Sequence, residues 1–266
     1  MMPRRAEGQK LTSDDCGAVR TVLMCTIPAT ALRFYMPLGR ELRNNGYDVT
    51  FCFADGAEAE AVRREGFQVQ TLSMRRKPFS LGNAIAVFQL AVFLRKNEVK
   101  VIETSTPVAS LVGRIAAVVA RVPVRINTVR GMFPRDTHRW QSALYDTVET
   151  VLHHASSFTI AINEKDELEL LDKGFARQDR IVNIGCGGVG VDTEEFDPQR
   201  YDYPTKKKQR EMLGIGKDDF VVTYVGRLTT EKGVLDLTCG RNPGPDNRPR
   251  ERFAHGILPR RKSRSS

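Results

Sequence analysis

The sequence lacks the patterns that mark several common classes of protein. Its five cysteines are scattered, with no Cys-x-x-Cys pair, so neither a disulfide framework nor a zinc module is indicated and a reducing compartment fits. The most apolar run, residues 85–94, is broken by Gln89 and is about half of the ~20 residues that a spanning helix needs. The first twenty residues have no apolar core of a secretion signal. We therefore expect a cytoplasmic protein, with peripheral attachment to a membrane left open.

A glycine-rich phosphate loop is missing where a dinucleotide-binding protein would have one. The first strand-like run, Val19–Ile27, continues into Pro28 and contains no glycine at its end, which argues against a nicotinamide-dependent oxidoreductase. A fingerprint-like set does occur at Gly185, Gly187 and Gly188, but it follows the last strand of the domain and no helix comes after it. We interpret these residues, with Pro28, as loops lining a cleft between domains.

The spacing of metal ligands is also absent. His153 and His154 are adjacent at the end of a helical segment, and no Cys, Asp or Glu stands nearby at a ligand spacing. We expect no metal, and we predict that these histidines are cations that interact with the negative end of the helix dipole.

The net charge of +9 gives little information about the folded part of the chain. Residues 239–266 contain eight Lys or Arg and two acidic residues, a net +6, so the rest of the chain carries only +3. The basic segment has five apolar residues and no helical or strand period, which predicts a disordered tail. It also lacks the interleaved aromatic residues of a nucleic-acid site, so we expect no nucleic-acid partner.

Strand-like and helix-like segments alternate along most of the chain. This spacing predicts an α/β fold, a Rossmann-like doubly wound parallel sheet whose ligands lie beyond the carboxyl ends of the strands. Thr106 and Asn163 are predicted N-caps for two of the helices. The predicted strands are Val19–Ile27, Tyr47–Phe53, Phe67–Leu72, Val99–Glu103, Val124–Val129, Phe158–Ile162 and Arg180–Ile184. The predicted helices are Ala31–Asn45, Asp55–Glu65, Ser80–Lys96, Pro107–Ala120, Trp140–His153 and Glu164–Lys173.

Composition then indicates a boundary and the start of a second α/β domain. A polar stretch and a predicted helix at Gln209–Leu213 precede the strand-forming residues Val221–Val225. Gly226 follows, with Arg227 and Lys232 in a segment that would open a helix, an arrangement that predicts either a phosphate site or an ordinary strand-to-helix turn with solvated charges. The predicted organisation is a disordered leader (1–18), a first domain (19–200), a linker (201–218), the start of a second Rossmann-like domain (219–238) and the basic tail (239–266).

Three segments together resemble the bacterial glycosyltransferases of family 4, of the capsular and exopolysaccharide type. They are NTVRGMFPRDTHRW through TIAINEKDELEL, NIGCGGVGVDTEEFDP, and VVTYVGRLTTEKGVLDL. The resemblance implies the GT-B fold, in which two Rossmann-like domains face each other across a cleft. It implies a retaining, metal-independent transfer from a nucleotide-diphosphate sugar to a lipid-linked or saccharide acceptor, with no further cofactor, at the inner face of the plasma membrane.

The resemblance also implies roles for individual residues. Gly226, Arg227 and Lys232 fall on the positions that bind the donor diphosphate, where fixed cations stabilise the charge of the leaving group. Arg130 is the catalytic candidate and Gly131 a cleft residue, because they follow a strand at the ligand-binding edge. Many relatives carry histidine at the position of Arg130, and arginine cannot act as a base near neutral pH.

A departure from the family pattern follows Leu237. The donor domain of the family continues for more than a hundred residues, whereas this chain changes composition within a motif, so we expect a truncated donor domain and a reading frame broken near Thr238. Such a chain is expected to be inactive alone. The alternative is a non-catalytic acceptor-binding module that pairs with a separate donor domain or transferase subunit.

Overall fold

The computed structural model describes residues 18–75, 80–130, 139–185, 190–191, 193–200, 202–226 and 233, without the side chains of 139–145. The chain divides into two compact units, with the boundary in the sequence between Val189 and Gly190, and each unit is described by itself. The predicted leader up to residue 17 and the predicted basic tail lie outside the described residues.

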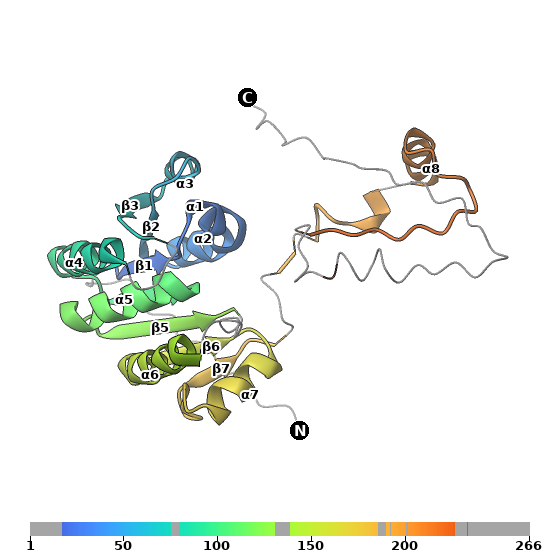
Figure 1. The fold of residues 1–266 in the computed structure, drawn as a ribbon. Coiled ribbons are helices and arrows are strands. Elements are labelled where there is room, and N and C mark those ends of the chain that lie inside the picture. Colours follow the sequence, from blue (N-terminus) through green and yellow to red (C-terminus); the bar gives the residue numbers. More distant parts are fainter. Residues whose placement is uncertain are drawn as a thin grey trace, which may run out of the picture. The chain divides into compact units, whose positions relative to one another are not determined.

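The first unit is built around a seven-stranded sheet in which every neighbouring pair is parallel (Figure 1). The α/β fold predicted from the sequence is confirmed. Both neighbours of β1 run parallel to it. Val22 lies beside Thr50 on one side and beside Ile102 on the other. In spatial order the strands are β3 (Gln68–Leu72), β2 (Asp48–Ala54), β1 (Arg20–Met24), β4 (Val101–Ser105), β5 (Val124–Val129), β6 (Phe158–Ala161) and β7 (Ile181–Asn183).

Helices connect these strands, and the residues of β1 show how they cover both faces of the sheet. Val22 and Met24 belong to one buried cluster, with α4 and α5, whereas Leu23 and Cys25 belong to another, with the helices up to α3. Both faces of the central strand are therefore dry, as its continuous apolar sequence predicts. The helices are α1 (Pro28–Thr30), η1 (Ala31–Tyr35), α2 (Met36–Asn44), α3 (Ala59–Arg64), α4 (Leu81–Lys96), α5 (Pro107–Ala120), α6 (Arg139–Ala155) and α7 (Glu164–Asp172).

Helix α5 lies unusually close to the sheet at Gly113. A Cβ atom added there would be 2.4 Å from Thr104 Cγ2 and 2.8 Å from Met24 Sδ. The glycine therefore sets the distance between α5 and strands β1 and β4. This close packing fixes the first turn of α5 against the end of the sheet where ligands bind in such folds.

The helix after β1 differs from its prediction in one respect. The predicted single helix contains a π-helical turn, η1, which is followed directly by α2. Such turns are rare and often lie at functional sites. Here the turn carries Tyr35, whose side chain is buried beside the carboxyl end of β4.

The second unit contains one α-helix among its described residues, α8 (Tyr203–Met212), after a short 3₁₀ turn, η2 (Pro198–Arg200). Asp202 caps α8 by accepting a hydrogen bond from Thr205 N at 3.0 Å, so the helix begins earlier than the predicted Gln209.

The predicted strand at Val221–Val225 is wrong. These residues form no strand, and Val222 and Val225 are 64% and 91% exposed. A strand forms in a sheet, and the described sheet consists of β1 to β7, none of which pairs with residues 221–225.

Among the described residues, no helix combines the length and hydropathy needed to cross a bilayer.

Candidate functional site

The candidate site lies where β1 and β4 are neighbours in the sheet. From this point the strand order runs outward in both directions, to β2 and β3 on one side and to β5, β6 and β7 on the other. In open parallel sheets, ligands bind in the crevice that this reversal creates beyond the carboxyl ends of the strands. The residues that follow β1, β4 and β5 therefore define the site.

Two threonines join the ends of β1 and β4. The Thr26 and Thr106 hydroxyls are 2.6 Å apart, and Thr26 N donates to Thr106 Oγ1 at 3.1 Å. Thr106 adopts φ 73° and ψ 142°, which is strained for a residue with a Cβ and costs on the order of 1–3 kcal/mol. Thr106 is the residue that precedes α5, as predicted, but the prediction that its side chain caps the helix is wrong. Its hydroxyl makes no capping hydrogen bond because it bonds to the Thr26 hydroxyl instead. Strain of this kind is typical of ligand-binding edges.

A buried carboxylic acid lies beneath this edge. Glu103 on β4 accepts hydrogen bonds at Oε1 from Thr128 Oγ1 at 2.6 Å and from the Tyr35 hydroxyl at 3.4 Å. Burial raises the pKa of Glu103, while the hydrogen bond from Thr128 and the charge of Arg130 oppose that rise. Burial, followed by the proximity of Glu103, also raises the pKa of Tyr35. The cluster joins three segments that are far apart in the sequence.

Arg130 lies above this cluster, directly after β5. Its Nε donates to Ser105 Oγ at 3.2 Å, and its guanidinium carbon is 5.0 Å from the centroid of the Tyr35 ring. The hydrogen bond and the ring contact orient a half-buried cation at the carboxyl edge of the sheet. This arrangement is suited to binding an anionic or hydroxyl-rich group.

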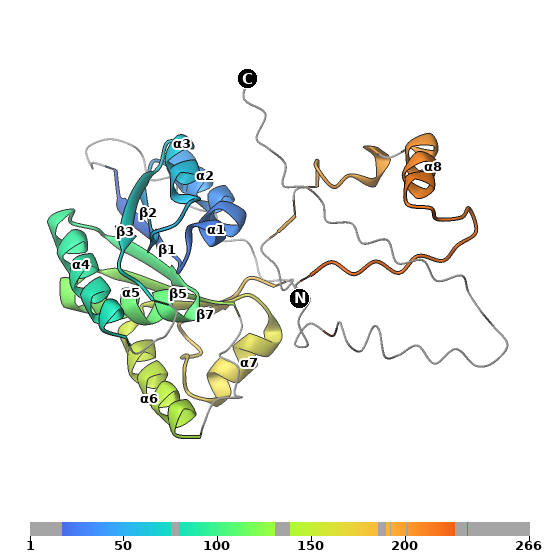
Figure 2. The same cartoon turned by 45° about the horizontal axis from the view of Figure 1, so that its top comes forward.

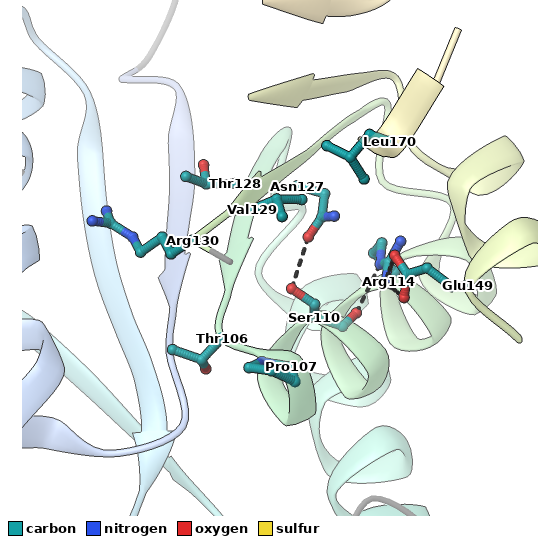
Figure 3. A pocket seen from close by; sticks show the side chains of 10 residues that line it. All are labelled: Thr106, Pro107, Ser110, Arg114, Asn127, Thr128, Val129, Arg130, Glu149 and Leu170. Atoms are coloured by element: carbon teal, nitrogen blue, oxygen red, sulfur yellow. Dashed lines mark hydrogen bonds and ion pairs between the residues drawn. The ribbon is translucent and has the colours of Figure 1, made fainter. Parts of the chain in front are cut away.

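A cavity of about 100 Å³ opens beside Arg130. Ligand pockets for drug-sized molecules are about 300–1,000 Å³, so this recess holds at most one part of a nucleotide sugar or glycan acceptor. Figure 3 shows Arg130 extending away from the group formed by Ser110, Asn127 and Arg114. The lining residues are Thr106, Pro107, Ser110, Arg114, Asn127, Thr128, Val129, Arg130, Glu149 and Leu170.

The inner wall of the cavity is a paired polar network. Arg114 Nη2 lies 2.8 Å from both carboxylate oxygens of Glu149, and Arg114 Nε donates to the Ser110 carbonyl at 3.1 Å. Ser110 Oγ donates to Asn127 Oδ1 at 2.7 Å, as drawn in Figure 3. The Arg114 and Glu149 side chains are only 3% and 10% exposed, so their charges depend on each other. We assign this network a structural role, in which it holds α5 against α6.

The adjacent histidines do not act as the pair of cationic caps that the sequence suggests. Burial of His153 lowers its pKa to about 4, with a further contribution from the charge of His154, so its ring is neutral at pH 7. That prediction is therefore wrong for His153. His154 Nδ1 lies 2.8 Å from the Thr150 carbonyl and is exposed, as expected of a group near a helix end. Groups of three or more His, Cys, Asp or Glu that could hold a metal do not occur among the described residues.

The other predicted site residues have different outcomes. Pro28 is buried at the start of α1 beyond β1, where a Cβ at Gly56 would lie 2.7 Å from its Cγ, so two loops at this edge pack closely. Gly185 is described, with φ +85°, and Gly226 is exposed in the second unit. Gly131, Gly187, Gly188, Arg227 and Lys232 lie outside the described residues.

Reasoning from sequence missed the residues that hold Arg130. Tyr35, Glu103, Ser105 and Thr128 come from η1, β4 and β5, and of these only Thr128 lies in one of the three family segments, where no role was predicted for it. One signal was available: Glu103 interrupts an otherwise uncharged strand, Val101–Ser105, that is nearly all buried. A carboxylate in a central strand needs partners, and these are found only after folding.

The strand order and the polar residues at the carboxyl edge define a doubly wound α/β domain, and the family comparison makes the class specific. Residues 32–187, more than half of the chain, match the model of the glycosyl transferase 4-like domain, so the chain belongs to this family.

Curated relatives agree with this assignment. The chain is 26% identical over 197 residues to the capsular polysaccharide biosynthesis glycosyltransferase CapM of Staphylococcus aureus, covering 74% of this chain and 50% of that protein. It is 28% identical over 151 residues to the UDP-Gal:alpha-D-GlcNAc-diphosphoundecaprenol alpha-1,3-galactosyltransferase of Escherichia coli, covering 56% and 38%. The chain thus spans about half or less of the length of these relatives.

A solved glycosyltransferase from Rickettsia africae shares the fold, with a TM-score of 0.63 and 17% identity, over 84% of this chain and 56% of that one.

Proposed function

We propose that this chain is the acceptor-side half of a retaining glycosyltransferase for cell-surface polysaccharide. The donor would be a nucleotide-diphosphate sugar, and the acceptor a lipid-linked or saccharide chain at the inner face of the plasma membrane. The observation that carries the proposal is the family match over residues 32–187, which contain Tyr35, the carboxyl ends of β4 and β5, and Arg130. The relatives supply the context, since one is named for capsular polysaccharide and another for a diphosphoundecaprenol substrate.

In this proposal Arg130 stabilises negative charge and transfers no proton. Its guanidinium is held by Ser105 and the Tyr35 ring, so its position is fixed before a ligand arrives. Preorganised cations of this kind stabilise the charge that develops on a leaving group or a phosphorylated acceptor. Gly226, Arg227 and Lys232 would bind the donor diphosphate, which remains a prediction from their sequence context.

A transfer assay tests the proposal on two proteins. The 266-residue chain by itself, given labelled UDP-sugars and a diphosphoundecaprenol-linked acceptor, is expected to show no turnover, because it spans only about half of CapM. A chimera that continues after Gly226 into the matching donor domain of CapM is expected to transfer sugar. Robust turnover by the chain alone would overturn the inactivity claim, and an inert but folded chimera would overturn the assignment.

Arg130 can be tested in the same chimera. Arg130→Ala is expected to lower kcat/KM by about 100-fold, the scale of removing one preorganised charge-stabilising donor. Arg63→Ala on α3 is the matched control, because Arg63 is an exposed cation whose ion pair is with Glu60, its neighbour on the same helix, at 3.5 Å. The anomeric configuration of the product, read by NMR, tests retention.

A second candidate function is a non-catalytic binding module that pairs with a separate donor domain or transferase subunit. The observation in its favour is the exposed apolar segment that includes Phe220, which is 93% exposed, and Val225. Such a segment needs a covering partner. Mixing the chain with a purified CapM donor domain separates the two functions. A complex on gel filtration that binds acceptor without transferring sugar supports the module, whereas transfer supports the enzyme.

A further inference from the structure

The outer face of α4 carries an exposed apolar stripe. Leu81, Ile85, Phe88 and Val92 are 86%, 52%, 71% and 49% exposed. At 3.6 residues per turn, their positions fall within an arc of about 60° and span about 16 Å along the helix. We name these four residues the α4 stripe. Isolated exposed apolar residues are common, but an aligned row on one helix face indicates an interaction surface.

The orientation of α4 is fixed by its other sides, so the stripe cannot turn inward. Ala86, Leu90 and Leu94 are buried in the cluster shared with β1 and α5. Two polar side chains of α4 also bond to the backbone that precedes the helix: Asn83 Oδ1 accepts from Arg75 N at 2.8 Å, and Gln89 Oε1 accepts from Ser73 N at 3.1 Å. Figures 1 and 2 both show α4 beside α5 at the outside of the first unit. The helix is therefore apolar on two faces, of which the sheet covers one.

Most charges around the stripe are positive, and the acidic group just beyond the helix, Glu98, is paired with Arg20 at 3.5 Å. Helix α4 contains no Asp or Glu, its last turn carries Arg95 and Lys96, and Arg75 lies against Gly82 near its first turn. A second copy of the chain would bring cations against cations in either orientation along the helix, which disfavours self-association. An occupant that is both apolar and anionic fits the stripe and its charges.

We propose that the α4 stripe docks on an anionic lipid bilayer. The helix lies parallel to the surface, with Leu81, Ile85 and Phe88 at the boundary between acyl chains and headgroups. Arg75 and Lys96 contact lipid phosphates, as is typical of interfacial amphipathic helices. This surface deepens the proposed function, since a diphosphoundecaprenol-linked acceptor would be held in such a bilayer. Docking itself requires neither a donor nor turnover.

Vesicle co-sedimentation of the full 266-residue chain tests the proposal. Vesicles of phosphatidylcholine with phosphatidylglycerol are the probe, and the variant is Ile85→Gln with Phe88→Gln. Losing these two side chains is expected to weaken binding on the order of tenfold or more, because both lose the apolar area that they would bury at the boundary of the bilayer. The matched control is Val151→Gln with Leu168→Gln, the same change at exposed sites on α6 and α7, which should bind like the unchanged chain. Thermal melting checks that both variants fold.

The basic segment 239–266 is present in every protein compared, so its own attraction to vesicles cancels. Repeating the assay at about 0.5 M salt, where the Debye length is about 4 Å, reduces that attraction further and isolates the apolar contribution. Arg75→Gln with Lys96→Gln is expected to weaken binding to anionic vesicles but not to pure phosphatidylcholine.

Two results would overturn the proposal. One is unchanged vesicle binding by the Ile85/Phe88 variant. The other is a dimer of the unchanged chain that this variant converts to a monomer, which would make the stripe an interface between copies. Failure here is distinct from failure of the proposed function: in the CapM chimera, the Ile85/Phe88 variant should still transfer sugar to a water-soluble saccharide acceptor.

Discussion

Two runs of similar residues have opposite fates in this chain. Val22–Cys25, within and just after β1, is at most 1% exposed, whereas Val221, Val222 and Val225 in the second unit are 42–91% exposed. Both runs are largely apolar and lie in segments predicted to be strands, yet among the described strands only the first has a paired neighbour on each side. Strand propensity therefore becomes structure only where other segments supply the pairing and the two covering layers.

The largest expected difference between the two units is the cost of breaking an ion pair, buried in one and exposed in the other. Arg114→Met leaves Glu149 buried without its partner and is expected to lower the unfolding free energy by about 3–5 kcal/mol. The counterpart in the second unit is Lys207→Met, which removes an exposed pair with Glu211 at 3.9 Å and is expected to cost at most about 0.5 kcal/mol. Urea denaturation measures both. A cost below about 1 kcal/mol for Arg114→Met would show that the wall of the cavity is not a coupled pair.

The apolar side of the comparison can be tested with one truncation in each run. Leu23→Ala empties a buried position between β1 and the helices up to α3 and is expected to cost about 2–5 kcal/mol. Val222→Ala removes an exposed side chain and should change stability by less than about 0.5 kcal/mol. Both values come from the same denaturation experiment. Equal costs would mean that the second run is covered in solution and would break the comparison.

The smallest effect is a pH dependence within the packed unit. The folded pKa of His153, about 4, lies below its unfolded value near 6.5, so the unfolded state binds more protons between these values. Stability should fall by about 2 kcal/mol from pH 7 to pH 5 through this group.

The variant His153→Gln should remove that part of the pH slope, whereas His154→Gln should retain most of it, because burial is the main cause of the lowered pKa of His153 and the charge of His154 is the next. The raised pKa of Glu103 acts in the opposite direction, but it is common to all three proteins and cancels in the differences. Identical slopes for the His153 variant and the unchanged chain would disprove the assignment.

Sequence patterns predicted the elements of the first unit because their signals are local. Strand Val124–Val129 and helix Pro107–Ala120 have the bounds that were predicted, since the strand is rich in β-branched residues and an initial proline marks the helix. Asn163 caps α7 as expected, accepting from Asp166 N at 2.7 Å.

The contacts that form the candidate site are not local, and sequence could not predict them. Arg114 and Glu149 are 35 residues apart, and Tyr35 and Glu103 are 68 apart. Each looks like an ordinary surface or core residue until the sheet brings it beside its partner. The wrong strand prediction at Val221–Val225 also comes from the non-local part of folding. The residues there favour a strand, but none of the described strands pairs with them.

The hydrogen-bonded threonines at the ends of β1 and β4 have a consequence for the order of folding. Thr26 and Thr106 are 80 residues apart, so forming this contact costs more loop-closure entropy than pairing β1 with β2. During synthesis, strands β1 to β3 are complete before α4, β4 and α5 exist. We expect the ligand-binding edge to form late, which proteolysis of nascent chains stopped before and after Ala120 would reveal as a late gain of protection around η1.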